Sequence, residues 1–438
     1  MFVRPRFAIR GLPCGRPIYH APLAADEKPV CLMHSRDPEK NEQDFWKEYE
    51  RLLQDVCEDV ADFSGFVFTG PMHETVFVKP CSFQRAIFLN DVDFWAANFQ
   101  HNVDFWGATF NGNVSFNMGS FGGVANFTDV RFAGAVEFKM AHFQWDNSAS
   151  TVNFGLIFTG VRCEKPEKVT FYQVNLSNAV FHNCDVSKFD FSDVTWRRRS
   201  NGKQMVYDEV ISLDYVYNVD SDLNPLKGVV VGRALDSRGS DPRNYRLIAE
   251  LYQQLKKNYD ERRDYTTAGD FHYGEMEMKR LTSSRRNRAL RWLHINLGLA
   301  AWYKYASDYG ESYVKPWSWL LLVVFVFMLL YPLVGLQLDR SRSNPSVASQ
   351  PIGAIEARPK LTYWHPLQGS SDTHSPRQAR LALIGHSLLA TLYIAAFQKD
   401  LTYQPSYPWG HLLALVETLL TSTVGGLFLL AVRRQFKR

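Results

Sequence analysis

Cysteine and histidine side chains near the N-terminus are the first residues in this chain that could do chemistry. Cys14, Cys31 and His34 could supply three ligands to a metal ion, with His20 or Cys57 as a fourth. A structural zinc ion takes four thiolate or imidazole ligands in tetrahedral geometry. Only Cys31 and His34 form a close pair, and the other spacings match no compact zinc pattern. We therefore expect ordinary buried cysteines here, with no metal and no other cofactor.

Catalytic patterns are not visible in the sequence. It contains no nucleophile triad, paired-carboxylate pocket, P-loop or glycine-rich dinucleotide turn. The stretch FHYGEMEMKR places His272, Glu275 and Glu277 close together, but an HxxE spacing is common on soluble helices. We expect a protein that is not an enzyme.

A cluster of positive charge precedes the most apolar part of the chain. The stretch KRLTSSRRNRALR lies about 25 residues before the first long apolar run and contains no acid. It could bind anionic lipid headgroups, where each charge near the surface contributes about 1 kcal/mol. A solvated helix face is the alternative, and nucleic acid is not expected because no groove-reading motif accompanies the charges. The candidate lipid-binding residues are Lys279, Arg280, Arg285, Arg286, Arg288 and Arg291.

Long apolar runs collect in the last 125 residues and indicate a membrane protein. Residues 317–336 form a run of 20 without a formal charge, and residues 409–432 form a second with one carboxylate. At about 1.5 Å per residue, each covers a hydrocarbon core of roughly 30 Å. We expect spans at 317–337 and 409–432, separated by an external loop (338–380) and a shorter apolar segment (381–397).

The distribution of basic residues predicts the topology. Arg433 and Arg434 directly follow the second span, and the segment before the first span is also basic. By the positive-inside rule, both termini then lie in the cytoplasm, which requires an even number of crossings. The 17-residue segment 381–397 should therefore dip in and return as a re-entrant helix. Arg340 and Arg342, just after the first span, weaken this argument. The N-terminus has no apolar signal-peptide core, so we expect a cytosolic front half.

The second span carries polar residues on one face. Glu417, Thr421 and Gly425 follow one another at one-turn spacing, and an ionisable group inside a span is a functional candidate. They are candidates to line a pore, together with His386 in the re-entrant segment and Lys399 just after it.

Two features leave the pore open to question. Glu417 could instead close a polar contact between helices, with Lys399, Lys304 or His386 as its partner. A potassium filter offers backbone carbonyls from a glycine-containing loop. The corresponding stretch here, QKDLTYQPSYPWG, has no glycine before Gly410.

The N-terminal half contains a repeat with an unusual spacing. In VDFWAANFQHNVDFWGATFNGNVSF (92–116), phenylalanines recur at alternating steps of five and six, which suits neither a strand nor a helix. The pattern runs from Phe83 to Phe143 and becomes strictly five from Phe171 to Trp196. A chain that turns a corner after each short strand explains this spacing, because four sides close a square coil. Coils about 4.8 Å apart then stack their inward rings.

This segment resembles the pentapeptide-repeat family in its Phe-centred variety. The resemblance covers residues 81–196, or about five coils, and implies a right-handed quadrilateral β-helix that acts as a scaffold. The phrases LYQQLKKNYDERRDYTTAGDFHYGEMEMKRL and SDYGESYVKP resemble a subset of bacterial pentapeptide-repeat membrane proteins. Their C-terminal part is similar to the two-helix pore module of potassium channels. The resemblance over 245–438 implies a multi-pass protein of the bacterial inner membrane.

The remaining segments connect these parts. We expect an N-terminal cap (1–80) with a helix at 42–60, a linker (197–242) and a cytosolic helical connector (243–316). Loops or bulges should interrupt the repeat at 145–151 and 160–168. The connector should contain three helices at 244–261, 264–281 and 286–305. The first should bury Ile248, Leu251, Tyr252, Leu255 and Tyr259, which share one helical face.

The fold class is therefore β with membrane α: a β-helix, a helical connector and two spans with a re-entrant helix between them. The first functional hypothesis is an oligomeric, channel-like membrane protein, a tetramer if it forms a pore, with a cytosolic sensing or docking domain. The alternative is a membrane-anchored scaffold that binds a protein and does not conduct. A DNA mimic is a weaker idea, since residues 81–196 hold 11 acids against 7 bases, a net charge of only −4. Expected partners are the lipid bilayer, further copies of the chain and a protein at the repeat.

Overall fold

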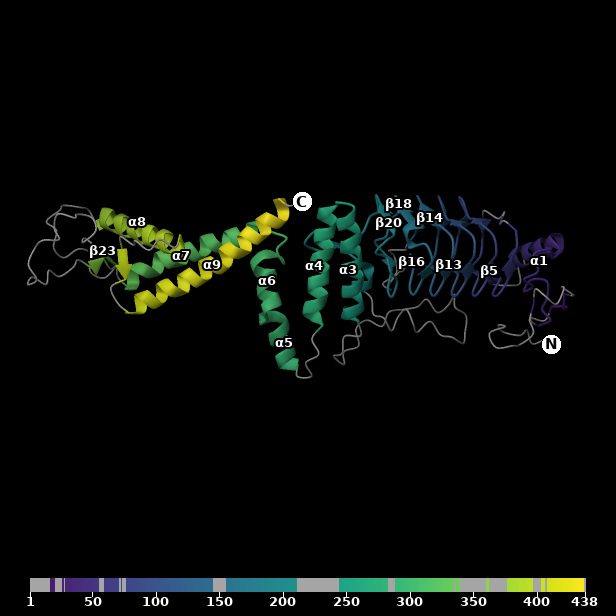
Figure 1. The fold of residues 1–438 in the computed structure, drawn as a ribbon, viewed down its shortest axis with the longest axis horizontal. Coiled ribbons are helices and arrows are strands. Elements are labelled where there is room, and N and C mark those ends of the chain that lie inside the picture. The colour runs from purple at the N-terminus through teal and green to yellow at the C-terminus, as the bar shows by residue number, and fades with distance from the viewer. Residues whose placement is uncertain are drawn as a thin grey trace, which may run out of the picture. The chain divides into compact units, whose positions relative to one another are not determined.

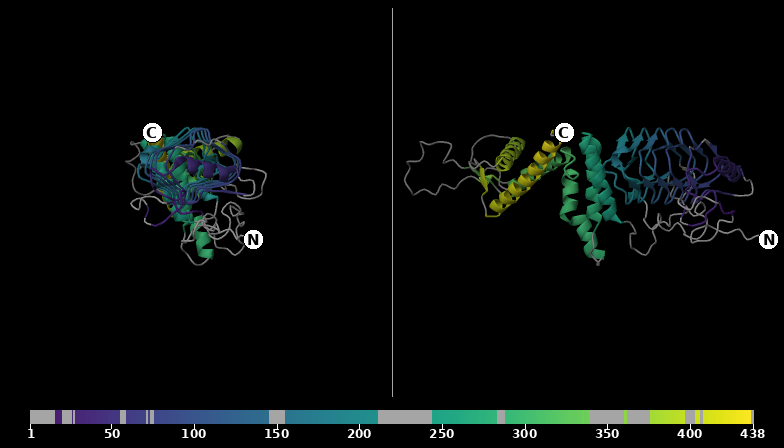
Figure 2. Two further views of the ribbon diagram at one scale, coloured as in Figure 1. Left: turned by 90° about the vertical axis from the view of Figure 1, so that its right-hand side faces the viewer. Right: turned by 45° about the vertical axis from the view of Figure 1, so that its right-hand side comes forward.

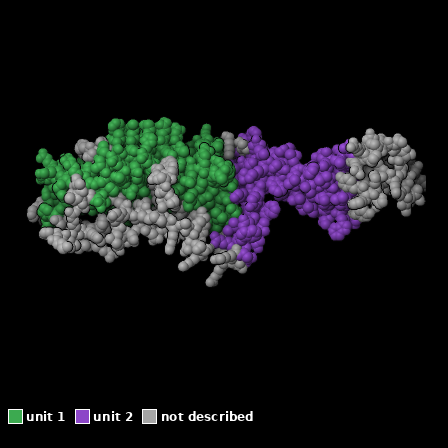
Figure 3. Space-filling view, turned by 180° about the vertical axis from the view of Figure 1, so that it is seen from behind, with its two compact units in different colours: residues 1–283 green, residues 284–438 purple. Residues whose placement is uncertain are grey.

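The computed structural model divides the chain into two compact units, Met1–Ser283 and Ser284–Arg438 (Figure 3). It describes residues 16–19, 26, 28–54, 59–70, 72, 76–144, 155–210, 244–282, 288–334, 336–338, 360–361, 376–396, 403–405 and 408–436.

Unit 1 is built around a β-solenoid of about five turns, in which short strands form four parallel sheets (Figure 1). The first sheet contains β1 (Ala61–Asp62), β4 (Cys81–Ser82), β8 (Val103–Asp104), β12 (Ala125–Asn126), β16 (Leu156–Ile157) and β19 (Ala179–Val180). The second contains β6 (Val92–Asp93), β10 (Val114–Ser115), β14 (Val136–Lys139), β18 (Val169–Tyr172) and β20 (Asp190–Ser192). The third contains β3 (Val76–Phe77), β7 (Asn98–Phe99), β11 (Ser120–Phe121) and β15 (His142–Phe143). The fourth contains β2 (Val67–Phe68), β5 (Ile87–Phe88), β9 (Thr109–Phe110), β13 (Arg131–Phe132) and β17 (Arg162–Cys163). Figure 2 shows the coils stacked side by side from α1 towards α3.

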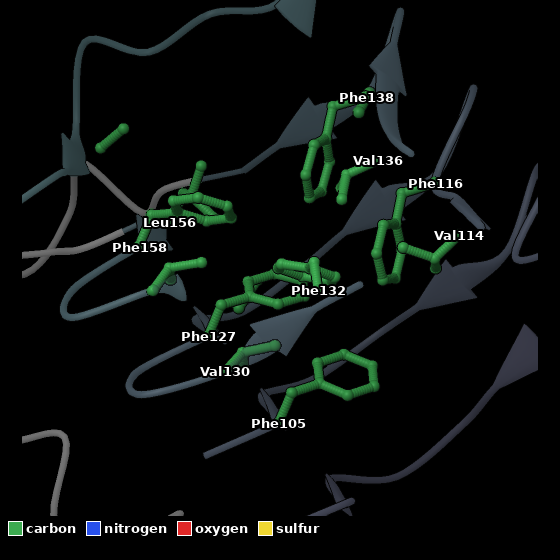
Figure 4. Packing of buried hydrophobic residues seen from close by; sticks show 14 of the residues in the cluster. Phe105, Val114, Phe116, Phe127, Val130, Phe132, Val136, Phe138, Leu156 and Phe158 are labelled. Atoms are coloured by element: carbon green, nitrogen blue, oxygen red, sulfur yellow. The ribbon is translucent and has the colours of Figure 1, made fainter. Parts of the chain in front are cut away.

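Phenylalanine rings fill the interior of the solenoid, as the spacing predicted. Phe105 is fully buried and stacks on Phe83 and Phe127, with ring centroids 5.1 and 5.0 Å apart. In the same way, Phe116 and Phe138 lie parallel with centroids 4.9 Å apart (Figure 4). Each inward ring thus contacts the equivalent ring one coil away, at a distance typical of favourable aromatic pairs.

Left-handed residues turn the chain at some corners of the coils, and glycines allow close approach at others. Ala96, Met118 and Met140 occupy equivalent corners of successive coils and have φ values of 54°, 56° and 54°. Each lies within a five-residue step between inward phenylalanines, such as the step from Phe94 to Phe99, where a left-handed residue turns the chain sharply. At another corner, a Cβ on Gly134 would lie 2.3 Å from the backbone oxygen of Gly112, so only glycine lets the coils approach there.

The solenoid extends beyond the predicted range. It begins at β1, because Ala61 pairs with Cys81 of the next coil, whereas the predicted range began at residue 81. The first coil was missed because its phenylalanines lie before Phe83, where the alternating spacing of five and six begins. The expected interruption at 145–151 lies outside the described residues. At 160–168, β17 still pairs in register with β13, and the irregular part is the short 3-10 helix η1 (Pro166–Lys168).

Helix α1 (Glu42–Gln54) covers the first coil. It buries Phe45, Tyr49 and Leu53, and the Tyr49 ring stacks on Phe63 with centroids 4.6 Å apart. The helix ends earlier than the predicted residue 60, and residues 55–58 lie outside the described part of the chain.

A hairpin and two helices cover the last coil. They are β21 (Arg197–Arg198), β22 (Gln204–Met205), η2 (Tyr207–Glu209), α3 (Tyr245–Glu261) and α4 (Tyr265–Leu281). The five apolar residues predicted on one face of α3 are all buried. Trp196 donates a hydrogen bond from Nε1 to the Tyr259 hydroxyl at 2.8 Å. The Asn258 amide donates to the carbonyls of Val186, Ser187 and Phe189. Residues 197–210, predicted as linker, therefore belong to the packed end of the solenoid.

Unit 2 is mainly helical. It contains α5 (Arg288–Leu297), α6 (Leu299–Ser307), α7 (Val314–Val334), α8 (Pro376–Ala395) and α9 (Pro408–Phe436). Helices α7 and α9 are long and apolar enough to cross a membrane. The strands β23 (Leu336–Leu338), β24 (Lys360–Leu361) and β25 (Tyr403–Pro405) form a small antiparallel sheet.

The third connector helix differs from its prediction, because it is divided at Gly298 into α5 and α6. Gly298 is extended (φ −72°, ψ 166°), and a Cβ there would lie 2.3 Å from the His294 carbonyl oxygen. The glycine therefore permits a break that another residue would oppose.

Candidate functional site

An exposed apolar ridge runs along one side of the solenoid. Met118 and Met140 occupy equivalent corners just before β11 and β15, and Trp95 precedes Ala96, which occupies the same corner one coil earlier, before β7. These three residues are here called the corner ridge. Their side chains are 56%, 47% and 41% exposed. Among the described residues of the coils, the other exposed large apolar side chains are Val76 and Val78, which flank Phe77 in the same sheet. Exposed apolar side chains that gather on one part of a protein surface are typical of interaction sites.

The backbone fixes the position of the ridge. Met118 and Met140 are left-handed corner residues, and their backbone N–H groups donate to Lys139 O and Tyr172 O of the following coils. The Trp95 N–H donates to the Asp93 carboxylate at 2.9 Å. Backbone bonds therefore hold the corners in place, and the apolar side chains remain outside the core.

Charged groups beside the ridge are compensated. Lys139 Nζ lies 2.8 Å from Glu137 Oε1, and the Asn117 amide donates to Glu137 Oε2 at 2.8 Å. The hydrogen bonds from Lys139 and then Asn117 hold the pKa of Glu137 below its ordinary value. The ridge therefore has a polar rim, the arrangement found around the apolar centre of protein interfaces.

The Cys31 and His34 pair ties the N-terminal segment to the first coil. Cys31 Sγ lies 3.0 Å from His34 Nδ1, and His34 Nε2 lies 3.2 Å from the Ser64 carbonyl oxygen. Lys40 is buried nearby, donates to the carbonyls of Ser35 and Val67, and lies over the Phe45 ring. Burial lowers the pKa of Lys40 to about 8.

The other proposed metal ligands, Cys14, His20 and Cys57, lie outside the described residues. Within the described ranges, no group of three or more His, Cys, Asp or Glu side chains could hold a metal ion.

The polar residues of the second span pack against α7. Glu417 is fully buried and accepts a hydrogen bond from the Tyr331 hydroxyl at 2.5 Å. Thr421, also buried, donates from Oγ1 to the Glu417 carbonyl oxygen at 2.8 Å. The partners predicted for Glu417 were Lys399, Lys304 and His386, and Tyr331 was not among them. A tyrosine inside an apolar span is the signal in the sequence that could have indicated it.

The structure describes two of the three remaining pore candidates. His386 is half-buried on α8, Gly425 is half-buried on α9, and Lys399 lies outside the described residues. The Glu417 side chain is buried within the single chain, whereas a Cβ on Gly425 of the same face would meet no atom within 4 Å.

Within the stretch that would correspond to a potassium filter, Tyr403–Pro405 form the strand β25. In β25, Gln404 pairs with Gln337 of β23, and Tyr403 pairs with Leu338. The backbone of this strand is therefore engaged within unit 2.

The candidate lipid-binding residues fall into different environments. Lys279 and Arg280 lie on α4 of unit 1 and form ion pairs with Glu275 at 2.5 Å and Glu277 at 2.9 Å. Their charges are thus compensated within α4.

Of the other four, Arg285 and Arg286 lie outside the described residues. Arg288 begins α5, and Arg291 is half-buried on the same helix.

The repeat is recognised by a family model. The model for pentapeptide repeats (nine copies) matches residues 73–117 and 96–142. This part of the chain therefore consists of pentapeptide repeats, as its spacing predicted. Neither a curated protein nor a solved structure matches the chain.

Proposed function

We propose that this pentapeptide-repeat chain is a membrane-anchored scaffold. The solenoid binds a partner protein along the corner ridge, and α7 and α9 cross the bacterial inner membrane with both termini in the cytoplasm. The observation that carries this proposal is the ridge itself. In the described coils, the exposed large apolar side chains gather on one sheet and the corner before it. The proposal includes no catalytic step.

The construction of unit 1 supports a docking role. Its rings form one continuous column of contacts, and α1 and α3–α4 cover the two ends. The sides of the solenoid therefore remain as the surface for a partner. A surface held by a closely packed core loses little conformational freedom on binding.

The residue types of the ridge suit a protein partner. Tryptophan is enriched among residues that dominate binding energy, and methionine adapts to irregular apolar surfaces. Trp95, Met118 and Met140 therefore offer apolar contact, while Glu137 and Lys139 at the rim offer directional polar contacts.

Conduction is the less favoured function. Glu417 is enclosed by its contact with Tyr331, and the filter-equivalent strand β25 is paired with β23. In the scaffold proposal, α8 does not cross the bilayer, because its apolar part, Leu383–Ala395, is shorter than a span. The chain therefore enters and leaves the membrane on the same side at α8. We expect no ion flux from the full chain in liposomes.

The experiment begins with a photo-reactive amino acid at Met118 in the full-length protein in its native membrane. The captured protein is identified, purified and titrated against reconstituted wild type, Met118→Lys and Thr109→Lys. Thr109 lies on β9 in a different sheet and receives the same charge. We expect Met118→Lys to weaken binding by about tenfold or more, as for a central interface residue, and Thr109→Lys to leave it unchanged. Equal affinity of all three proteins would refute docking at the ridge.

A further inference from the structure

Helices α5 and α6 carry an exposed apolar and aromatic surface outside the spans. Seven large side chains of these helices are between 43% and 90% exposed. The residues are Leu290, Trp292, Leu293 and Leu297 on α5, and Leu299, Trp302 and Tyr305 on α6. An amphipathic helix of this composition is too apolar for water and too basic for the hydrocarbon core.

A tight corner joins α6 to the first span. Asp308, Tyr309 and Gly310 have φ values of 51°, 61° and 81°, three consecutive left-handed residues. The Gly310 N–H donates to Ser307 Oγ at 3.0 Å, and Lys315 Nζ lies 2.7 Å from Asp308 Oδ1. This corner sets the direction of α6 against that of α7. Within unit 2, α5 and α6 run across the ends of α7 and α9 (Figures 1 and 2).

Direct contacts hold α6 and the corner at one end of the two spans. Trp319 of α7 donates from Nε1 to the Tyr305 carbonyl oxygen at 3.2 Å. Arg434 of α9 donates to the Tyr309 carbonyl oxygen at 3.3 Å and pairs with Glu311 at 3.1 Å. Arg434 lies near the end of α9, where a crossing helix leaves the hydrocarbon. The surface of α5–α6 is therefore continuous with the membrane-facing surface of the spans.

The charge of this region matches an anionic surface. Residues 279–307 contain seven Lys or Arg and no Asp or Glu, and Arg288 and Arg291 belong to α5 itself. Tryptophan and tyrosine prefer the headgroup level, and arginine next to them meets lipid phosphates.

We propose that α5–α6 is an interfacial anchor lying along the cytoplasmic surface of the bilayer. Trp292, Leu293 and Trp302 enter the boundary between headgroups and acyl chains, and Arg291 contacts the phosphates of anionic lipids. The inference rests on the proposed function only in requiring that α7 and α9 cross the bilayer. It assigns the connector a role of its own, which is to fix the membrane end of the chain that leads to the solenoid.

Nitroxide labels in the full chain test the depth of this anchor. All six cysteines lie at or before Cys184, so unit 2 has none, and the accessible ones can be replaced by serine. Labels at Leu293→Cys and Trp302→Cys are compared with one at Arg246→Cys, an exposed position on α3. In vesicles of phosphatidylcholine and phosphatidylglycerol, we expect the first two labels to collide more with oxygen and less with a soluble nickel complex than the third. Water-like accessibility at both positions would overturn the proposal.

Two further arms separate the alternatives. In vesicles of phosphatidylcholine alone, or with Arg291→Gln, the label at 293 should become more accessible to nickel, whereas Arg246→Gln should have no effect. An unchanged label in both cases would rule out the anionic-lipid contact. Spin–spin broadening that disappears on dilution with unlabelled protein would mean that a second copy covers this surface, and would also overturn the proposal.

A label at Phe325→Cys, an exposed position of α7, reports on the spans themselves. If this label also collides freely with nickel, the proposed function fails because α7 does not cross the bilayer. If it is shielded while the labels at 293 and 302 are not, the interfacial anchor alone fails.

Discussion

At the scale of single residues, the solenoid depends on rings that each contact a ring in the neighbouring coils. Phe105 stacks between Phe83 and Phe127 and is fully buried, so its loss leaves a cavity lined by rings that the backbone holds apart. The surrounding coils cannot close such a gap without changing their register.

Phe105→Ala should therefore lower the free energy of unfolding of unit 1 by about 3–5 kcal/mol. Met118→Ala removes a large but exposed side chain and should change it by less than about 0.5 kcal/mol. Urea unfolding of the full chain in detergent, followed by fluorescence, measures both. Similar losses for the two variants would contradict the stacked core.

Asp208 provides a residue-scale prediction about pH. Its carboxylate accepts the Phe181 N–H at 3.2 Å from each oxygen, and complete burial raises its pKa from 3.8 to about 7. The folded state then keeps a proton that the unfolded chain releases near pH 4. The stabilisation that comes from the protonated Asp208 carboxyl is present below about pH 4 and is lost as the pH rises towards 7.

Asp208→Asn should remove this part of the pH dependence while keeping an acceptor for the Phe181 N–H. Thermal unfolding of wild type and variant across this pH range tests the expectation. The two midpoints should converge at the acidic end and separate at the neutral end, with the variant higher. A constant difference would show that Asp208 does not titrate.

At the scale of elements, the two ends of the solenoid must be covered because a terminal coil would otherwise expose its rings and backbone carbonyls. At the C-terminal end, helix α3 covers both the rings and the carbonyls. Its apolar face covers the rings, and Asn258 satisfies three carbonyls of the last coil.

Asn258→Ala should remove a donor from all three carbonyls, although Val186 O still accepts from the Phe189 N–H and Phe189 O from Arg262. The loss at Ser187 O should cost about 1–3 kcal/mol, the range for unsatisfied buried polar groups. Lys257→Ala on the exposed side of the same helix is the matched control and should be near neutral. Hydrogen exchange of residues 186–191, together with the unfolding free energy, gives the answer. Unchanged protection in Asn258→Ala would mean that the cap contributes little.

At the scale of the whole molecule, the two units have separate hydrophobic cores. One cluster runs through the solenoid, α1, α3 and α4, and another joins Phe327, Tyr331, Ala390 and Ile394 of the helices in unit 2. A unit with its own core and covered ends should fold without its neighbour.

A fragment of residues 1–283 should therefore be soluble and unfold cooperatively, with a midpoint within a few degrees of that in the full chain. A fragment of residues 1–210, which lacks α3 and α4, should aggregate because the last coil is exposed. Circular dichroism and light scattering distinguish the two. Aggregation of both fragments would show that unit 1 needs the membrane part.

The sequence by itself determined the features that repeat locally. The phenylalanine spacing predicted the coil and its stacked core, the helical spacing of Tyr252 and its neighbours predicted the buried face of α3, and run length identified α7 and α9. These predictions succeed because side-chain direction follows from backbone period alone.

Only the tertiary structure decided which distant residues meet. The pairing of Tyr331 with Glu417, the alignment of Met118 with Met140 and the hydrogen bond from Trp196 to Tyr259 depend on register and on how the elements pack. Equivalent residues of neighbouring coils lie 22 apart, and Tyr331 lies 86 residues from Glu417. Contacts over such separations are set by the packing of whole elements, which no local spacing records.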